Sequence, residues 1–167
     1  KRNMKKLINL MTEFGAFFYP KHKFHFPLKL ISSEMPIGIK YKDGVSAQLK
    51  SAVILAGLNS YGNTEITEIL KSRDHTENLI LLNKKVIKIK SGKNRIIKIF
   101  GKNNLKSINV DVPGDPSSAA FFTALTLLNQ KSFIKIKDVG LNPKRIGFYK
   151  LLKNRGAKIK FKNIKKI

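Results

Sequence analysis

The sequence predicts an α/β (α+β) fold built from a repeated unit, and three observations support this prediction. Amphipathic stretches of helical period alternate with short strands in which apolar residues recur at every second position. Arg2, Arg73 and Arg145 follow one another at intervals of 71 and 72 residues. Ser46 and Ser117, each near the start of an apolar stretch, are 71 residues apart. Strands that alternate with helices in this way pack a sheet against helices.

Amphipathic helices followed by strands are the first part of the repeat. The stretches "MKKLINLMTEFGAFFYP" and "GFYKLLKNRGAKIKFK" each read as a helix, then Gly-Ala, then a strand, and "TENLILLNKKVIKIK" has the same shape without Gly-Ala. Gly15 and Gly156 stand where the C-terminus of a helix favours a left-handed residue. We therefore expect a helix before each glycine and a strand after it.

Apolar helices with small polar starts are the second part. "VSAQLKSAVILAGL" and "DPSSAAFFTALTLL" are such stretches, and short strands are expected after them at "TEITEI" and "SFIKIKDV". In the second stretch Asp115 is the expected N-cap and Pro116 takes the first helical position, where its missing N–H costs nothing. The acidic character of this turn is thereby explained by helix capping rather than by catalysis.

The net charge of +24 raises the question of a nucleic-acid partner. Lysine accounts for 29 of the 34 basic residues, whereas nucleic-acid recognition favours the planar fork of arginine. Many lysines alternate with isoleucines, as in "KVIKIK" and "AKIKFK", which places lysine on the solvated faces of strands. We therefore favour solvated strand faces over a nucleic-acid surface, and expect the charge to attract small anions.

Cysteine is absent, which excludes disulfides and thiolate metal sites and agrees with a cytoplasmic location. No apolar run approaches the roughly 20 residues of a membrane span, so no membrane association is expected. The basic, apolar start of the chain is interrupted by Glu13 and Gly15 and has no small-residue cleavage site after it. A signal peptide is not expected.

Two stretches hold the candidate binding residues. Ser46, Ala47 and Gln48 occupy the first turn of an apolar helix, where free backbone N–H groups and a hydroxyl favour an anion; alternatively, Ser46 is only an N-cap. In "KSRDHTENL", Arg73 is a candidate ligand for phosphate or carboxylate.

The acids of "KSRDHTENL" have a structural explanation. Asp74 and Glu77 have the spacing of a capping box. His75 has the chemistry of a proton carrier or metal ligand, but a lone histidine is more often structural, and no metal site is predicted.

Several motifs together resemble the 5-enolpyruvylshikimate-3-phosphate (EPSP) synthase family, also called 3-phosphoshikimate 1-carboxyvinyltransferases. "SAQLKSAVILAGL", "SRDHTENL", "DVPGDPSSAAFF" and "VGLNPKRIGF" stand in the order and at about the spacing of that family. The opening "KRNM" is similar to the family's Lys-Arg-Pro-Met turn, with Asn3 in place of proline, a change expected to loosen the turn. The resemblance extends over essentially all 167 residues.

The resemblance implies transfer of the enolpyruvyl group of phosphoenolpyruvate to the 5-hydroxyl of shikimate 3-phosphate, with release of phosphate and without metal or organic cofactor. Ser46, Ala47, Gln48 and Arg73 would bind shikimate 3-phosphate, while Arg2 and Gln48 would bind phosphoenolpyruvate. The family's acid and base residues have no counterpart in this chain. It therefore reads as an internal fragment of the enzyme, expected to be inactive alone and monomeric when full length.

The family fold, an inside-out α/β barrel, consists of two domains of three βαβαββ units each. Residues 1–113 would belong to the first domain, and residues 114–167 would begin a unit of the second. Two alternatives remain open at this point: a basic module that binds nucleic acid or another polyanion, and a non-catalytic α/β repeat domain.

Overall fold

The computed structural model describes residues 2–44, 46–83 and 85–165 and divides into two compact units, Lys1–Ile108 and Asn109–Ile167. This division falls five residues before the predicted boundary at 113. The assignment of the two pieces to different domains of a larger fold stays a prediction. Each unit is described by itself.

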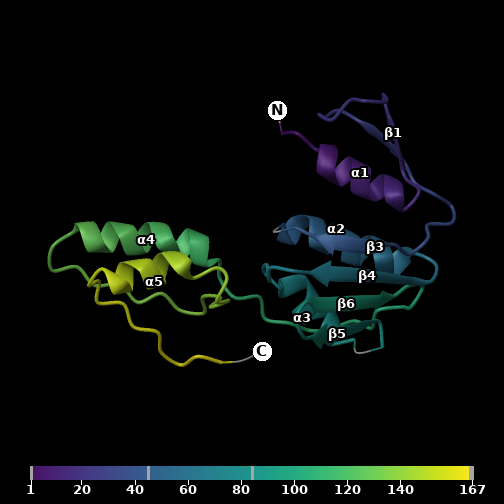
Figure 1. Cartoon of the computed structure of the whole chain (residues 1–167). Coiled ribbons are helices and arrows are strands. Elements are labelled where there is room, and N and C mark those ends of the chain that lie inside the picture. The colour runs from purple at the N-terminus through teal and green to yellow at the C-terminus, as the bar shows by residue number, and fades with distance from the viewer. Residues whose placement is uncertain (1, 45, 84, 166–167) are drawn as a thin grey trace. The chain divides into compact units, whose positions relative to one another are not determined.

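A four-stranded sheet forms the centre of the first unit, with strand order β3-β4-β6-β5 (Figure 1). Its strands are β3 (Lys40–Asp43), β4 (Asn63–Glu68), β5 (Ile87–Ser91) and β6 (Arg95–Phe100). Strands β3 and β4 are parallel, and the other two pairs are antiparallel. Helix α2 (Ala47–Asn59) supplies the crossover that a parallel pair requires, and α3 (His75–Leu81) connects β4 to β5. The order β3-α2-β4-α3-β5-β6 is one complete βαβαββ unit, which confirms the predicted fold class.

The chain enters this unit through helix α1 (Lys5–Glu13) and a short hairpin of β1 (Phe17–Tyr19) and β2 (Lys29–Ile31). Gly15 follows α1 with φ +90°, the left-handed conformation expected at that position. Helix α1 contacts both β1 and α2. The residues before α1 are thereby brought close to the first turns of α2.

The core of the first unit lies between α2 and the sheet. Val53 and Ile54 of α2 are fully buried, as are Ile66 of β4 and Ile97 and Ile99 of β6. On the edge strand β5 the alternate lysines at 88 and 90 are exposed, which confirms the prediction of solvated lysine faces for this strand. This core packs α2 against β4 and β6.

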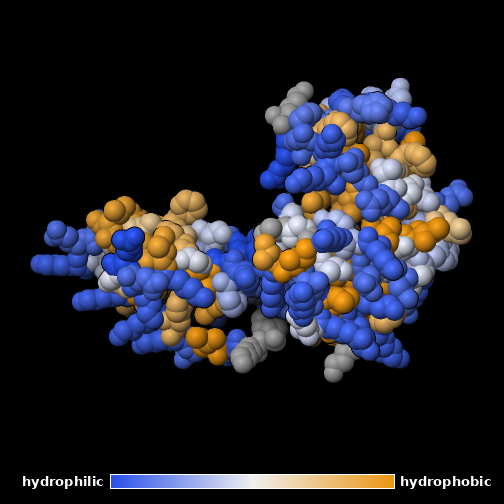
Figure 2. Space-filling model, in the orientation of Figure 1, coloured by the Kyte–Doolittle hydropathy of each residue, from blue (hydrophilic) through white to orange (hydrophobic). Residues whose placement is uncertain are grey.

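The second unit has a smaller core and two helices, α4 (Pro116–Leu128) and α5 (Gly147–Asn154). Ala119, Ile146 and Tyr149 form its buried apolar cluster, and the Tyr149 hydroxyl donates to the carbonyl of Pro116, which is also buried, at 2.5 Å. Much of the apolar side of α4 is exposed, with Phe121 at 78% and Leu128 at 84% (Figure 2).

Two strands expected in this unit, at 132–139 and 157–162, are not found there. In the described part of the chain these segments contribute only one isolated bridge, between Gly114 and Val139. A strand requires a neighbour that pairs its backbone, and alternation in sequence does not supply that neighbour.

Candidate functional site

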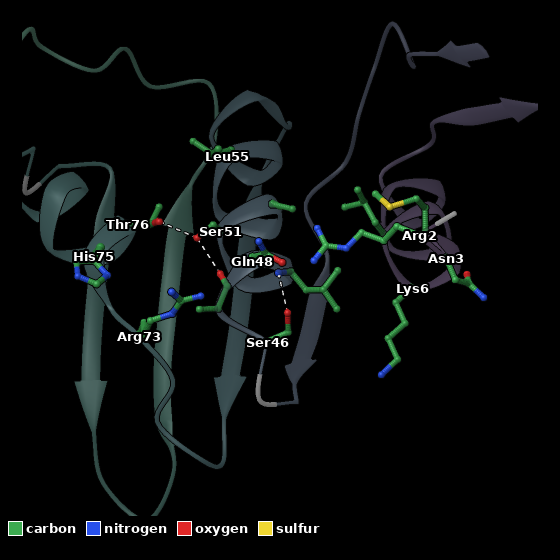
Figure 3. Close-up of a pocket in the computed structure, with 15 residues that line it drawn as sticks. Arg2, Asn3, Lys6, Ser46, Gln48, Ser51, Leu55, Arg73, His75 and Thr76 are labelled. Atoms are coloured by element: carbon green, nitrogen blue, oxygen red, sulfur yellow. Dashed lines mark hydrogen bonds between the residues drawn. The ribbon is translucent and has the colours of Figure 1, made fainter. Parts of the chain in front are cut away.

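A cleft of about 650 Å³ lies in the first unit, between the start of α1 and the first turns of α2 and α3 (Figure 3). All five predicted binding residues line it: Arg2, Ser46, Ala47, Gln48 and Arg73. Among the described residues that line the cleft there is no aspartate or glutamate, while Lys6 adds a third fixed cation. The lining therefore favours an anionic ligand.

The first turn of α2 forms one wall of the cleft. Ser46 is the N-cap, in extended conformation, and its hydroxyl accepts the Leu49 N–H at 3.3 Å. The first N–H groups of a helix have no intrahelical acceptor, and the helix dipole places partial positive charge there. Ser46 is thus an N-cap that also lines the cleft, so its capping role does not exclude a role in binding an anion.

The turn between β4 and α3 carries Arg73. Figure 3 shows its side chain extending toward the first turn of α2. The preceding residue, Ser72, is buried and donates two hydrogen bonds to Glu68, from its backbone N–H at 2.7 Å and from its hydroxyl at 3.0 Å. Helix α3 is joined directly to α2 by a 2.7 Å hydrogen bond between the hydroxyls of Ser51 and Thr76. These bonds fix the position of the turn relative to α2.

Arg2 reaches the cleft from the turn before α1, and in Figure 3 it extends toward Gln48. The Met4 N–H donates to the Phe24 carbonyl at 2.8 Å, and His25 Nδ1 lies 3.0 Å from the Arg2 carbonyl oxygen. Asn3 Oδ1 accepts the Lys5 N–H at 2.9 Å, a bond that the proline of the related turn has no side-chain acceptor to make. The turn therefore has its own hydrogen bonds in place of the rigidity of proline.

The comparisons with known proteins decide the family. Residues 1–167 match the family model described as EPSP synthase (3-phosphoshikimate 1-carboxyvinyltransferase). This chain belongs to the EPSP synthase family. It is 40% identical over 164 residues to the 3-phosphoshikimate 1-carboxyvinyltransferase of Bacillus subtilis strain 168, covering 97% of this chain and 37% of that protein. It is 46% identical over 123 residues to the enzyme of the same name from Aquifex aeolicus, covering 73% of this chain and 28% of that protein.

Solved EPSP synthases have the same fold. A structure of the enzyme from Acinetobacter baumannii superposes with a TM-score of 0.72 and 33% sequence identity, covering 94% of this chain and 35% of that one. The chain thus spans little more than a third of the length of the EPSP synthases that it matches over nearly all of its own length.

Sequence reasoning missed some residues that line the cleft of this EPSP synthase family member. Lys6 lies in the first turn of α1, four residues after Arg2, which precedes the helix. Ser51 and Thr76 line the cleft through the hydroxyl pair that joins α2 to α3. His75, considered as a proton carrier, does line the cleft and is exposed. The basic start "KRNMKK" was the signal for Lys6 in the sequence, whereas the Ser51–Thr76 pair required the fold.

The predicted capping box of Asp74 and Glu77 is wrong. Asp74 occupies the N-cap position at φ −120° and ψ 24°, outside the extended conformation of a cap, and makes no capping hydrogen bond; its carboxylate lies 3.3 Å from Lys71. Glu77 is fully buried, and its Oε1 lies 2.7 Å from Lys50 Nζ and 3.0 Å from Arg95 Nη1. The buried Lys50 and the partly buried Arg95 attract this carboxylate more strongly than a helix end does.

Among the described residues, no three His, Asp or Glu side chains come together as metal ligands. No helix in that part of the chain is long and apolar enough to cross a membrane.

Proposed function

We propose that this chain is the part of a 3-phosphoshikimate 1-carboxyvinyltransferase that binds the phosphate of shikimate 3-phosphate and one side of phosphoenolpyruvate. The complete protein would transfer the enolpyruvyl group to the 5-hydroxyl of shikimate 3-phosphate and release phosphate, with no metal or organic cofactor. It would act as a cytoplasmic monomer in the pathway to the aromatic amino acids.

One observation carries this proposal: five residues from three separate segments, predicted as substrate ligands, line a single cleft whose described lining has no carboxylate. Both proposed substrates are anions with a phosphate group. A helix start and converging guanidinium groups bind such ligands well, because dipole, N–H donors and charge all act in the same direction.

The roles follow from position. Ser46 and Ala47, at the start of α2, would hold the phosphate of shikimate 3-phosphate with the hydroxyl and a backbone N–H. Arg73 would pair with the same substrate from the opposite side. Gln48 is exposed on the next position of the helix and extends toward Arg2 in Figure 3, which suits an amide that contacts both substrates. Arg2 would form paired hydrogen bonds with phosphoenolpyruvate.

Turnover requires an acid–base pair, of which the described lining of the cleft offers at most the exposed imidazole of His75. Proton transfer in such a reaction calls for a positioned acid and base, and the described lining offers no carboxylate. We therefore expect the 167-residue chain by itself to bind substrate without producing enolpyruvylshikimate phosphate. Product formation by the purified chain would contradict this expectation.

Calorimetry with a matched set of ligands tests the proposed binding. Shikimate 3-phosphate should bind the 167-residue chain, whereas shikimate, which lacks the phosphate, should bind at least about tenfold more weakly because the charge-assisted bonds at α2 are absent. Equal affinity for the two ligands, or no binding of shikimate 3-phosphate, would count against the proposal.

A basic polyanion-binding module is the competing interpretation of the +24 charge. Binding of a short DNA or RNA duplex should then be tight and fall steeply with salt, since each neutralised phosphate releases counterions. The transferase proposal expects only weak binding of either duplex, with no competition by shikimate 3-phosphate. The module would be favoured if the duplex binds more tightly than shikimate 3-phosphate and the salt dependence of its affinity corresponds to several neutralised phosphates.

A further inference from the structure

Four charged side chains form an ion square between α2, α3 and the sheet: the buried Lys50 of α2, Glu68 of β4 and Glu77 of α3, and the partly buried Arg95 of β6. Each cation contacts both carboxylates. Lys50 Nζ lies 2.7 Å from an oxygen of each glutamate, and Arg95 Nη1 lies 2.8 Å from Glu68 and 3.0 Å from Glu77. The side chains of Lys50, Glu68 and Glu77 are 0% exposed.

The two glutamates of the ion square differ in their remaining contacts. Glu68 Oε1 also accepts both hydrogen bonds of Ser72, the residue before Arg73. Glu77 Oε2, by contrast, is buried without a hydrogen-bond partner in the described structure. Within the square, Glu68 is therefore the member with bonds to the turn that presents Arg73.

The turn itself has little packing to hold it. Between β4 and Ser72 the apolar side chains of Ile69 and Leu70 are 52% and 62% exposed, and Lys71 is exposed as well. Since more than half of each of these apolar side chains is exposed, their burial contributes little to holding the turn. The buried carboxylate of Glu68 supplies the anchor in their place.

Glu68 remains an anion in this setting. Burial opposes its ionisation, but hydrogen bonds from Lys50, Arg95 and Ser72 outweigh the burial and lower the pKa of Glu68 to about 2. An ionised acceptor makes shorter and stronger hydrogen bonds than a neutral one. The ion square thus keeps Glu68 in the form that binds Ser72 most strongly.

We propose that Glu68 is a positioning residue of the substrate site: its buried carboxylate holds Ser72, and through Ser72 sets where Arg73 meets a phosphate bound at the start of α2. The inference rests on the proposed function for the ligand, and on the geometry of the ion square for the mechanism. Glu68 contacts Ser72 rather than substrate, so it acts through Arg73.

Two double variants distinguish a role of Glu68 in positioning Arg73 from a general effect of removing buried charges. Lys50→Met with Glu68→Met removes one cation, one anion and the anchor of Ser72. Lys50→Met with Glu77→Met removes the same charges but leaves Glu68 bonded to Arg95 and Ser72. Replacing a buried ion pair by apolar residues of similar volume is often tolerated, so both proteins are expected to fold.

The readouts are calorimetry with shikimate 3-phosphate and hydrogen exchange at the Ser72 amide in the full 167-residue chain. We expect the Glu68 variant to bind about tenfold more weakly or worse, and the Glu77 variant to stay within about threefold of the parent chain. The Ser72 amide should exchange faster in the Glu68 variant alone. Lys50→Met with Glu68→Gln, which restores an acceptor for Ser72, should recover part of the affinity and of the protection, and it carries the test if the Glu68→Met protein is unfolded.

Equal weakening of binding in the Glu68 and Glu77 variants would overturn the inference, as would a Ser72 amide that stays protected without the Glu68 carboxylate. If the parent chain does not bind shikimate 3-phosphate, the proposed function fails, and Ser72 exchange still decides whether Glu68 holds the turn. The two failures are therefore distinguishable.

Discussion

The starts of α2 and α4 use similar parts in different ways. Each helix has a polar N-cap, Ser46 in α2 and Asp115 in α4. At α4 the cap is itself an anion: the Asp115 carboxylate accepts the Ser117 N–H at 3.2 Å and pairs with Arg145, which also donates to the Ser117 hydroxyl at 2.6 Å. At α2 the cap is a neutral hydroxyl, and its neighbour across the cleft is Arg73.

This difference shows how a helix start beside an arginine can either stabilise the fold or bind a ligand. A helix start beside an arginine attracts an anion. In α4 the protein supplies that anion from its own chain, and the hydrogen bond from the Ser117 backbone together with the charge of Arg145 lowers the pKa of Asp115. In α2 no carboxylate is among the described residues that line the cleft, so an external anion has a place to bind.

Converting α2 into a copy of α4 should have the largest effect. Ser46→Asp keeps a good N-cap, because aspartate caps helices about as well as serine, but puts a negative charge where the phosphate would bind. We expect affinity for shikimate 3-phosphate to fall about 100-fold or more, since like charges in contact cost several kcal/mol. Ser46→Asn caps without charge and serves as the control in calorimetry. Similar affinities of the two variants would show that the phosphate lies elsewhere.

Removing the arginine beside each helix start is the next test of the difference between α2 and α4. Arg73→Ala should weaken binding of shikimate 3-phosphate by about 2–3 kcal/mol, or roughly 30- to 140-fold, because a charge-assisted hydrogen bond is lost. Arg145→Ala, the matched change at α4, should leave the affinity unchanged and lower the melting temperature. An equal loss of binding in both variants would mean that the effect comes from net charge.

Removing the Asp115 carboxylate should create a weak phosphate-binding site at the start of α4. In Asp115→Ala, Arg145 and the first N–H groups of α4 lose their internal anion. We expect inorganic phosphate at millimolar concentration to shift the Ser117 amide signal in this variant and to leave it unchanged in the parent chain, as observed by NMR. No shift in the variant would mean that a helix start and an arginine are insufficient at α4.

Acid should destabilise the first unit through Glu68. The pKa of Glu68 is lowered from 4.5 to about 2, so the folded protein holds fewer protons than the unfolded chain between these values. The stabilisation is present above about pH 4.5 and is lost as the pH falls toward 2. Denaturant unfolding at several pH values should show a shallower acid dependence in Lys50→Met with Glu68→Met than in the parent chain. Identical slopes would contradict the low pKa.

The smallest expected effect separates the two serines of the repeat. Ser46→Ala should lower the free energy of unfolding by about 1 kcal/mol, the usual cost of losing an N-cap. Ser117→Ala should change it by less than about 0.5 kcal/mol, because the cap of α4 is Asp115 and Ser117 is exposed. Thermal unfolding followed by circular dichroism measures both. A larger loss for Ser117→Ala would reverse the assignment of the caps.

Local signals in the sequence were sufficient for the starts of α2 and α4 and for the end of α1. Ser46 and Asp115 were predicted as helix starts, and Gly15 as the left-handed residue after α1, because capping depends on neighbouring residues alone. The cleft could be predicted because the motifs around Arg2, Ser46 and Arg73 resemble those of a known family. The repeat of about 70 residues predicted the order of helices and strands in the unit but not which strands pair.

The ion square could not be predicted in the same way, because its members meet only through the fold. Lys50 is the one charged residue within α2, and that isolation was a signal that it would need a buried partner. Nothing local identified Glu68 and Glu77 as those partners, so Glu77 was assigned to a cap. The prediction of a strand at 132–139 was wrong for a related reason, since the alternation of apolar and polar residues does not reveal whether a neighbouring strand is present.

One measurement tests the central claim that the start of α2, and not that of α4, binds the substrate phosphate. Shikimate 3-phosphate is titrated into the isotopically labelled chain while the amide signals of Ala47, Gln48 and Ser117 are followed by NMR. The account predicts saturable shifts at Ala47 and Gln48 and no shift at Ser117. Shifts at Ser117 with none at Ala47 and Gln48, or equal shifts at all three, would contradict it.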